Sequence, residues 1–462
     1  MTRPFAITLL LLGCGGLPPA AGPQPEVGEE LLGGDTTVFD ETRGAFTLPS
    51  RTLTDGARRD DFFAGNAFFN RAWVAAPAST SGSDGLGPLF NATGCDACHL
   101  KDGRAGPPET ADEPFLGVLF RISVPGEGPH GGPKPDPVYG GQLSPHGIFG
   151  VPSEVTPRVR WVEQPGRFAD GEPYSLRAPV YSFDDPQYGP LPTELLVSPR
   201  AAPAMVGLGL LELVSEAQVL SHADPDDRDG DGISGRPNQV WDVRQGALRL
   251  GRFGWKAGQP TVEQQSAGAF LGDVGITSSL FPEQDCTAAQ AACAAAPSGG
   301  APELTDDKLA AVTFYGQHLA PPGRRNWKAP EVLQGRELFR GAGCTACHLE
   351  RLTTAQAPGF PELSNQTIRP YTDLLLHDLG EGLADHRPDF AASGTEWRTA
   401  PLWGLGLVPV VNRHDHYLHD GRARGVMEAV LWHGGEAQRS RDEVVQMSKA
   451  ERARLIAFLE SL

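Results

Sequence analysis

The chain lacks several features that would assign it to common classes of protein. Beyond its amino terminus it has no long apolar run, so we expect no membrane-spanning helix there. Basic residues are few: 39 Lys and Arg stand against 57 Asp and Glu, for a formal net charge of −18. This balance excludes nucleic acid and anionic membrane surfaces as natural partners. Cysteine is also scarce, with seven among 462 residues.

Four of these cysteines lie in two copies of the motif CxxCH, Cys95-Asp-Ala-Cys98-His99 and Cys344-Thr-Ala-Cys347-His348. In this motif the thiols add to the vinyl groups of haem, and the adjoining imidazole becomes an iron ligand. A structural metal or disulfides would use the same cysteines, but two complete copies favour covalent haem. The sequence therefore predicts two haem c groups.

The length and the two motifs predict two haem domains, at residues 35–325 and 326–462. The 57 Gly and 42 Pro indicate long ordered loops over modest helical cores. We expect a mainly α fold of two c-type cytochrome domains with long loops. Strand-like alternation at residues 115–124, 158–162 and 175–183 predicts a small β insertion in the first domain.

The amino terminus has the pattern of an export signal. Residues 1–14 resemble a lipoprotein signal that is cut before a lipidated Cys14; the alternative is an ordinary secretory signal with an incidental cysteine. Either pattern predicts a periplasmic protein or one anchored at the outer membrane, and residues 15–34 are expected to form a flexible tether. In this oxidising setting Cys286 and Cys293 are predicted to form a disulfide.

Repeated patterns indicate an internal duplication. Arg200-Ala-Ala-Pro203 parallels Arg398-Thr-Ala-Pro401, and each half ends in a predicted helix, one with Thr305 as N-cap and one with a Ser448 capping box. Arg200 and Arg398 are candidates to bind haem propionates; the alternative is that they only cap loops.

A further pair of segments, residues 255–270 and 419–434, aligns without gaps and places His433 opposite Ala269. The second haem is therefore predicted to have two protein ligands, His348 and His433, and the first to be open for chemistry. The alternative for His433 is a surface histidine. Competing ligands are His419, Met427 and Met447 for the second haem, and His130 and His146 for the first.

An open haem that reduces peroxide needs a group to move a proton between the two oxygens. Glu263 is the candidate, and Gln264 or Gln265 is a candidate to share its pocket. The alternative is that Glu263 is a solvated helix residue. Trp255 is expected either to line this pocket or to pack nearby.

The two motifs, together with the stretches at residues 373–406 and 418–437, resemble the bacterial di-haem oxidoreductases, which are described as peroxidases and were once called thiol oxidoreductases. That family is similar to di-haem cytochrome c peroxidases and to the di-haem enzyme that matures a tryptophan-derived quinone. The resemblance implies a peroxidatic first haem and an electron-transfer second haem. It places the distal glutamate on Glu263. The relatives have a methionine ligand at the position that His433 occupies here, and a histidine there implies a lower reduction potential for the second haem than methionine would give. The distal glutamine falls on Phe253, a departure from the pattern.

The same relatives hold a calcium ion between domains. Here the acidic segment after residue 226 has Asp-x-Asp-x-Asp-Gly spacing, which converges oxygen ligands on calcium; the alternative is a solvated acidic turn. The predicted ligands are Asp227, Asp229, Asp231, Ile233 and Asn238. A bridging tryptophan between the haems has no matching motif, and Trp327 is its only candidate.

The leading hypothesis is an exported di-haem peroxidase that reduces hydrogen peroxide, or another small oxidant, with electrons from a small cytochrome c or cupredoxin. One alternative is an electron carrier with both irons six-coordinate. Another is a di-haem enzyme that oxidises or oxygenates a protein or organic substrate. A thiol oxidase has no support, because every cysteine is already assigned.

Overall fold

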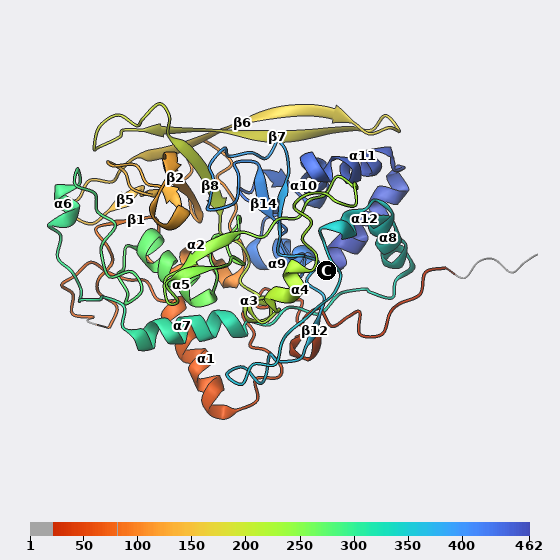
Figure 1. Ribbon diagram of the computed structural model, residues 1–462, viewed down its shortest axis with the longest axis horizontal. Coiled ribbons are helices and arrows are strands. Elements are labelled where there is room, and N and C mark those ends of the chain that lie inside the picture. Colours follow the sequence, from red (N-terminus) through yellow and green to blue (C-terminus); the bar gives the residue numbers. More distant parts are fainter. Residues whose placement is uncertain (1–21, 81) are drawn as a thin grey trace, which may run out of the picture.

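The computed structural model describes residues 22–80 and 82–462 (Figure 1). The largest hydrophobic cluster draws residues from both halves of the chain: Trp255 and Val262 from the first pack in the same core as Trp403 and Leu455 from the second. Packing is therefore continuous across the predicted boundary at residue 325.

In the first half, two helices cross at close range. They are α1 (Gly56–Phe69) and α7 (Asp306–His318). A Cβ on Gly65 would overlap the carbonyl oxygen of Ala311, so the approach of α1 to α7 depends on this glycine. Asp55 caps α1 by accepting a hydrogen bond from the amide of Arg58.

The second half repeats this arrangement with α8 (Pro330–Gly341) and α12 (Lys449–Ser461). A Cβ on Gly335 would overlap the carbonyl oxygen of Arg454, so this crossing also depends on a glycine. Ser448 begins α12 with a complete capping box. Each crossing joins the helix before a CxxCH motif to the helix that ends its half, as the internal duplication predicts.

The first half carries two β structures between its CxxCH motif and α3 (Leu208–Glu212). One is a four-stranded antiparallel sheet in which β2 pairs with β3, β4 and β8. The other is the long antiparallel hairpin of β6 and β7, which runs along one side of the molecule above β8 and α10 (Val426–Leu431; Figure 1). The strands are β2 (Val118–Glu127), β3 (Pro133–Lys134), β4 (Gln142–Leu143), β6 (Thr156–Arg167), β7 (Pro173–Asp184) and β8 (Leu196–Ala201).

The tip of this hairpin contacts the second half. The amide of Ala169 donates to the carbonyl oxygen of Val445, and the Arg452 guanidinium donates to Asp170 over 2.9 Å. The insertion therefore fastens the two halves together.

The expectation of a mainly α fold is wrong. Helices hold 28% of the described residues and strands 19%, spread over many small sheets. Most of these strands are two to four residues long, too short to leave a two-residue periodicity in the sequence. The remaining strands are β1 (Leu89–Phe90), β5 (His146–Gly147), β9 (Gln239–Asp242), β10 (Ala247–Leu250), β11 (Leu352–Thr353), β12 (Thr367–Ile368), β13 (Leu376–Asp378), β14 (Glu396–Arg398), β15 (His416–Tyr417) and β16 (Ala423–Arg424). The remaining α-helices are α2 (Cys95–Cys98), α3 (Leu208–Glu212), α4 (Glu216–Leu220), α5 (Val262–Ala269), α6 (Ala291–Ala294), α9 (Val408–Asn412), α10 (Val426–Leu431) and α11 (Gln438–Gln446).

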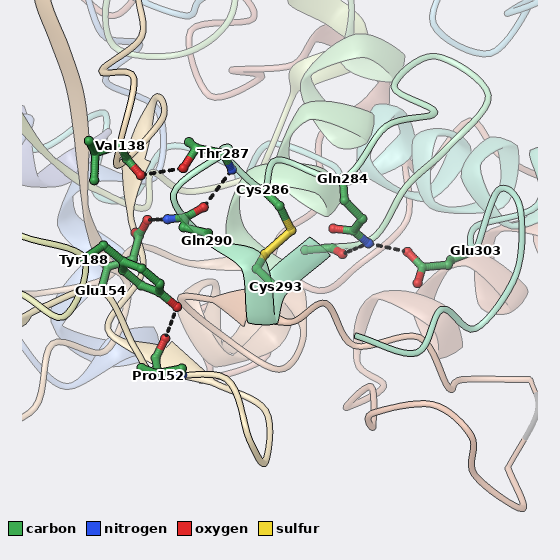
Figure 2. The surroundings of a disulfide bond; sticks show 11 residues. Val138, Pro152, Glu154, Tyr188, Gln284, Cys286, Thr287, Gln290, Cys293 and Glu303 are labelled. Carbon is green, nitrogen blue, oxygen red and sulfur yellow. Dashed lines mark hydrogen bonds between the residues drawn. A yellow bond between two sulfur atoms is a disulfide. The ribbon is translucent and has the colours of Figure 1, made fainter. Parts of the chain in front are cut away.

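The loop before α7 contains a disulfide between Cys286 and Cys293 (Figure 2). Beside it, the hydroxyl of Thr287 donates to the carbonyl oxygen of Val138, and the amide of Gln290 donates to buried Glu154. The disulfide loop is thus fastened to the β insertion.

The predicted tether is packed where the structure describes it. Leu32 is fully buried, and buried Glu29 accepts hydrogen bonds from Arg324, next to the predicted boundary, and from Arg336 of the second half. The predicted signal and Cys14 lie outside the described residues. In the described part of the chain, no helix combines the length and apolar character needed to cross a membrane.

Candidate functional site

The second CxxCH motif opens into a mostly apolar cavity with a volume of about 200 Å³. Its lining includes Cys344, Cys347 and His348 together with residues of α10 and of the turn that follows it. Aliphatic and aromatic side chains make most of the wall, among them Phe339, Leu383, Trp397, Leu402, Leu405, Val426, Val430, Leu455 and Leu459.

Two histidines of this cavity are prepared as metal ligands. Nδ1 of His348 lies 2.8 Å from the carbonyl oxygen of Tyr371, and Nδ1 of His433 lies 2.8 Å from that of Ala429. Each imidazole that donates from Nδ1 keeps Nε2 free. Burial lowers the pKa of His348 to about 4, and burial also lowers the pKa of His433. Both rings are therefore held neutral, as iron ligation requires.

The competing ligands lie differently. His419 also lines the cavity, but its ring is stacked on Trp397 at 3.7 Å between centroids. Met427 and Met447 are partly buried against the core, and neither lines the cavity.

One polar residue of this cavity escaped the sequence analysis. His377 lies 3.5 Å from the Cys347 sulfur and 2.7 Å from carboxylate oxygens of both Asp373 and Glu436. Burial alone would lower its pKa, but these hydrogen bonds raise it to about 12. A buried imidazolium therefore adjoins the second attachment site. The sequence offered one sign of this pair: His377 lies four residues after Asp373, within the stretch at residues 373–406 that resembles the family.

The two predicted propionate ligands, Arg398 and Arg200, lie in different environments. Arg398 lines the cavity, and its guanidinium donates to the carbonyl oxygens of Gly254 and Thr399. Arg200 does not line the cavity; it is paired with Asp389 at 3.2 Å. The duplicated arginines thus do not share one environment.

At the first motif, Cys95 and Cys98 lie at the two ends of α2, and His99 follows. Nδ1 of His99 lies 2.8 Å from the carbonyl oxygen of Pro203, which leaves Nε2 free here too. Burial, reinforced by the charge of Asp273, raises the pKa of both thiols to about 12, so they are neutral.

The donor sets fit haem at both motifs. Each offers two neighbouring thiols and an imidazole oriented by a backbone carbonyl, and the second adds an apolar cavity lined by another such imidazole, that of His433. A family model described as "Di-haem oxidoreductase, putative peroxidase" matches residues 27–462, nearly the whole chain. The chain belongs to the di-haem oxidoreductase family. The resemblance found in the sequence is thereby confirmed, and the family implies two haems. No curated protein matches the chain significantly.

In the first half, the residue that aligns with His433 is Ala269 and not a histidine. His130 stacks on Trp241 with 3.8 Å between ring centroids, and His146 stacks on Phe90 at 5.4 Å. Both rings are thus engaged with aromatic neighbours.

The candidate acid–base residue lies near the start of α5. Glu263 is partly exposed and accepts two hydrogen bonds from Arg244, the shorter at 2.6 Å. The amide of Gln264 is bonded to Trp241 and Gln259. Phe253, at the position of the family's distal glutamine, is buried in the core.

Trp255 contacts both the second cavity and the segment that orients His99. Its ring lines the second cavity, and its Nε1 donates to the carbonyl oxygen of Ala201 over 2.8 Å. Pro203, which orients His99, lies two residues further along. Trp327, the bridge candidate from sequence, packs under Lys328 and does not line the cavity.

The predicted calcium ligands do not all meet. The carboxylates of Asp227, Asp229 and Asp231 lie within 4.8 Å of one another. Ile233 follows them in the loop and lines the second cavity. Asn238 is buried, and its amide is bonded to the backbone at residues 256, 389 and 391. Calcium binding stays a prediction for the three aspartates.

Proposed function

We propose that this di-haem oxidoreductase is an exported peroxidase that reduces hydrogen peroxide. Cys95 and Cys98 would hold one haem c covalently, and Cys344 and Cys347 the other. When bound, an iron with a free position supplies a binding place for peroxide, and an iron with two protein ligands transfers electrons with little rearrangement.

The observation that carries this proposal is the difference between the two sites. His348 and His433 face one cavity with both Nδ1 atoms bonded to the backbone. His99 has the same backbone bond, but the two histidines that sequence offered as its counterpart, His130 and His146, are stacked on other rings. One electron-transfer site and one open site are what a di-haem peroxidase needs.

In this scheme Trp255 carries electrons between the sites. It touches the second cavity directly, and the short segment from Ala201 to Pro203 links its Nε1 to the imidazole of His99. Glu263 is the proposed proton carrier at the open site. Because its carboxylate accepts hydrogen bonds from Arg244, it must exchange that partner for the substrate.

Electron paramagnetic resonance of the oxidised protein tests the proposal. We expect one high-spin and one low-spin haem, and peroxide consumption when a reduced small cytochrome c is supplied. Glu263→Gln should lower turnover by about 100-fold, the usual contribution of a general acid–base group. Glu216→Gln is the matched control, because Glu216 forms a comparable surface ion pair with Arg249.

Other outcomes separate the alternative functions. Two low-spin signals that cyanide leaves unchanged would contradict a peroxidase and indicate an electron carrier. Slow peroxide decay without a donor, together with a protein radical, would instead indicate oxidation of a protein or organic substrate. Export is tested by fractionating cells and by labelling Cys14 with a fatty-acid analogue.

A further inference from the structure

Arg104 follows the first CxxCH motif along the chain, but in the fold its side chain lies at the second site. It lies five residues after His99, yet its side chain lines the cavity of the second CxxCH motif. There the guanidinium carbon lies 5.6 Å from the ring centroids of both Trp255 and Tyr417.

The second half holds this loop in place by several hydrogen bonds. Oδ1 of Asn412 accepts from the amide of Arg104, and Nδ2 of the same residue donates to the carbonyl oxygen of Leu100. Nε2 of His414 lies 3.1 Å from the carbonyl oxygen of Arg104, and Nη2 of Arg104 donates to that of Leu418 over 2.6 Å. The position of Arg104 is therefore fixed by both halves.

The charge of Arg104 has no carboxylate partner among the described residues. Its Nε is buried without a hydrogen-bond acceptor, and burial lowers the pKa of the guanidinium to about 10. Tyr417 and Asp420 raise this pKa, and the only carboxylate of the two, Asp420, is already paired with Arg422.

Arg398 also lines this cavity, and its guanidinium likewise has no carboxylate partner among the described residues. It donates only to backbone carbonyl oxygens, and burial lowers its pKa to about 10. The carboxylate that raises its pKa, Asp373, is bonded to His377. Two buried guanidinium groups without anions are costly, because the protein interior solvates charge poorly.

We propose that Arg104 and Arg398 bind the two propionates of the second haem, with Arg104 acting across the boundary between the halves. Two carboxylates carried into this cavity would neutralise both cations and accept from the free Nε of Arg104. Arg200 needs no such partner, because Asp389 already supplies one. The inference rests on the proposed haem c at Cys344 and Cys347.

The test compares Arg104→Gln with Arg104→Lys and uses Arg252→Gln as control. Arg252 is also a buried arginine, bonded to the carbonyl oxygen of Leu211, but it does not line the cavity. Haem content is measured as the pyridine haemochrome, reduction potentials by spectroscopic titration, and propionate contacts by the propionate-bending bands in resonance Raman spectra.

Removing a cation beside a haem favours its oxidised form. We expect Arg104→Gln to shift the reduction equilibrium of the low-spin haem by about tenfold, or about 59 mV towards lower potential. Arg104→Lys keeps the charge and should hold the potential while shifting the propionate band, because it loses the planar fork. Arg252→Gln should change neither.

Two haems per chain with unchanged potential and propionate band in Arg104→Gln would overturn the inference, as would a shift confined to the high-spin haem. If Arg104→Gln does not accumulate, the propionate band of Arg104→Lys decides, and an unshifted band overturns the inference. Fewer than two haems in the unmodified protein would instead contradict the proposed function.

Discussion

The two CxxCH sites are nearly identical on the side of the motif histidine. The ring centroids of Phe69 and His99 lie 6.2 Å apart at 51°, and those of Phe339 and His348 lie 6.3 Å apart at 53°. Both histidines have Nδ1 at 2.8 Å from a carbonyl oxygen, and both sites adjoin a helix crossing built on a glycine. The duplicated unit thus holds the histidine of each CxxCH motif in the same way in both halves.

On the opposite side the two sites differ. In the second half, α10 ends at Leu431, and His433 follows within the cavity. In the first half, the aligned residue is Ala269, and α5 continues into a π-helical turn, Phe270–Val274. The comparison teaches that the proposed difference in role between the two sites depends on one residue beyond a shared scaffold.

The largest expected effect comes from exchanging these two residues. His433→Ala should open the second site and convert its low-spin signal to high-spin. It should lower donor-dependent turnover by about 100-fold, because the loss of a residue that only hydrogen-bonds to a metal ligand can already cost that much. Electron paramagnetic resonance and steady-state peroxide consumption measure both. His386→Ala is the control, because His386 is an exposed histidine of the same half.

The converse change, Ala269→His, should close the first site. We expect a second low-spin signal and loss of cyanide binding. A cyanide response equal to that of the unmodified protein would show that the alignment of the two segments does not extend to the position of the ligand.

The next effect concerns the two helix crossings. Gly65→Ala and Gly335→Ala each place a methyl group against a backbone carbonyl, which cannot move aside easily, so each should lower the free energy of unfolding by about 1–3 kcal/mol. Gly56→Ala in α1 and Gly341→Ala in α8 are matched controls, since a Cβ there meets open space. Thermal unfolding followed by circular dichroism measures the differences. A loss at only one crossing would show that the duplication is not equivalent in packing.

A smaller effect is expected from a buried carboxyl group beside the first site, Asp102. Burial raises the pKa of Asp102, near His99, from its ordinary 3.8 to about 7, and its Oδ1 has no hydrogen-bond partner. Ionisation therefore costs the folded state nothing below pH 3.8, an increasing amount up to pH 7, and a constant amount above.

Asp102→Asn keeps an acceptor for the Tyr315 hydroxyl and removes this cost. We expect it to raise stability by about 2 kcal/mol at pH 8 and by much less at pH 4.5. Denaturant titrations at the two pH values measure this, and an equal gain at both would exclude ionisation as the cause.

Local features of both sites could be predicted from sequence. The CxxCH spacing, the disulfide cysteines seven residues apart and the alternation in β2, β6 and β7 each depend on neighbours along the chain. The family was also identified from such local motifs.

Features that depend on distant contacts could not be predicted. Arg104 follows the first motif, and only the fold brings it to the second cavity, beside Trp255. Residues 26–34 have a tether-like composition, yet Glu29 is buried because arginines about 300 residues away surround it. The two-residue strands leave no pattern at all, which is why a mainly α fold was expected.

The smallest expected effect compares the helices that end the two halves. Ser448 caps α12 by accepting from the amide of Glu451, whereas Thr305 begins α7 without a capping hydrogen bond to the backbone. Ser448→Ala should therefore cost about 1 kcal/mol of unfolding free energy, and Thr305→Ala appreciably less, because only the first leaves a helix amide without its acceptor. Urea unfolding of the two variants measures the difference. Equal losses would mean that Thr305 stabilises α7 through its contact with Asp307 as strongly as a true cap does.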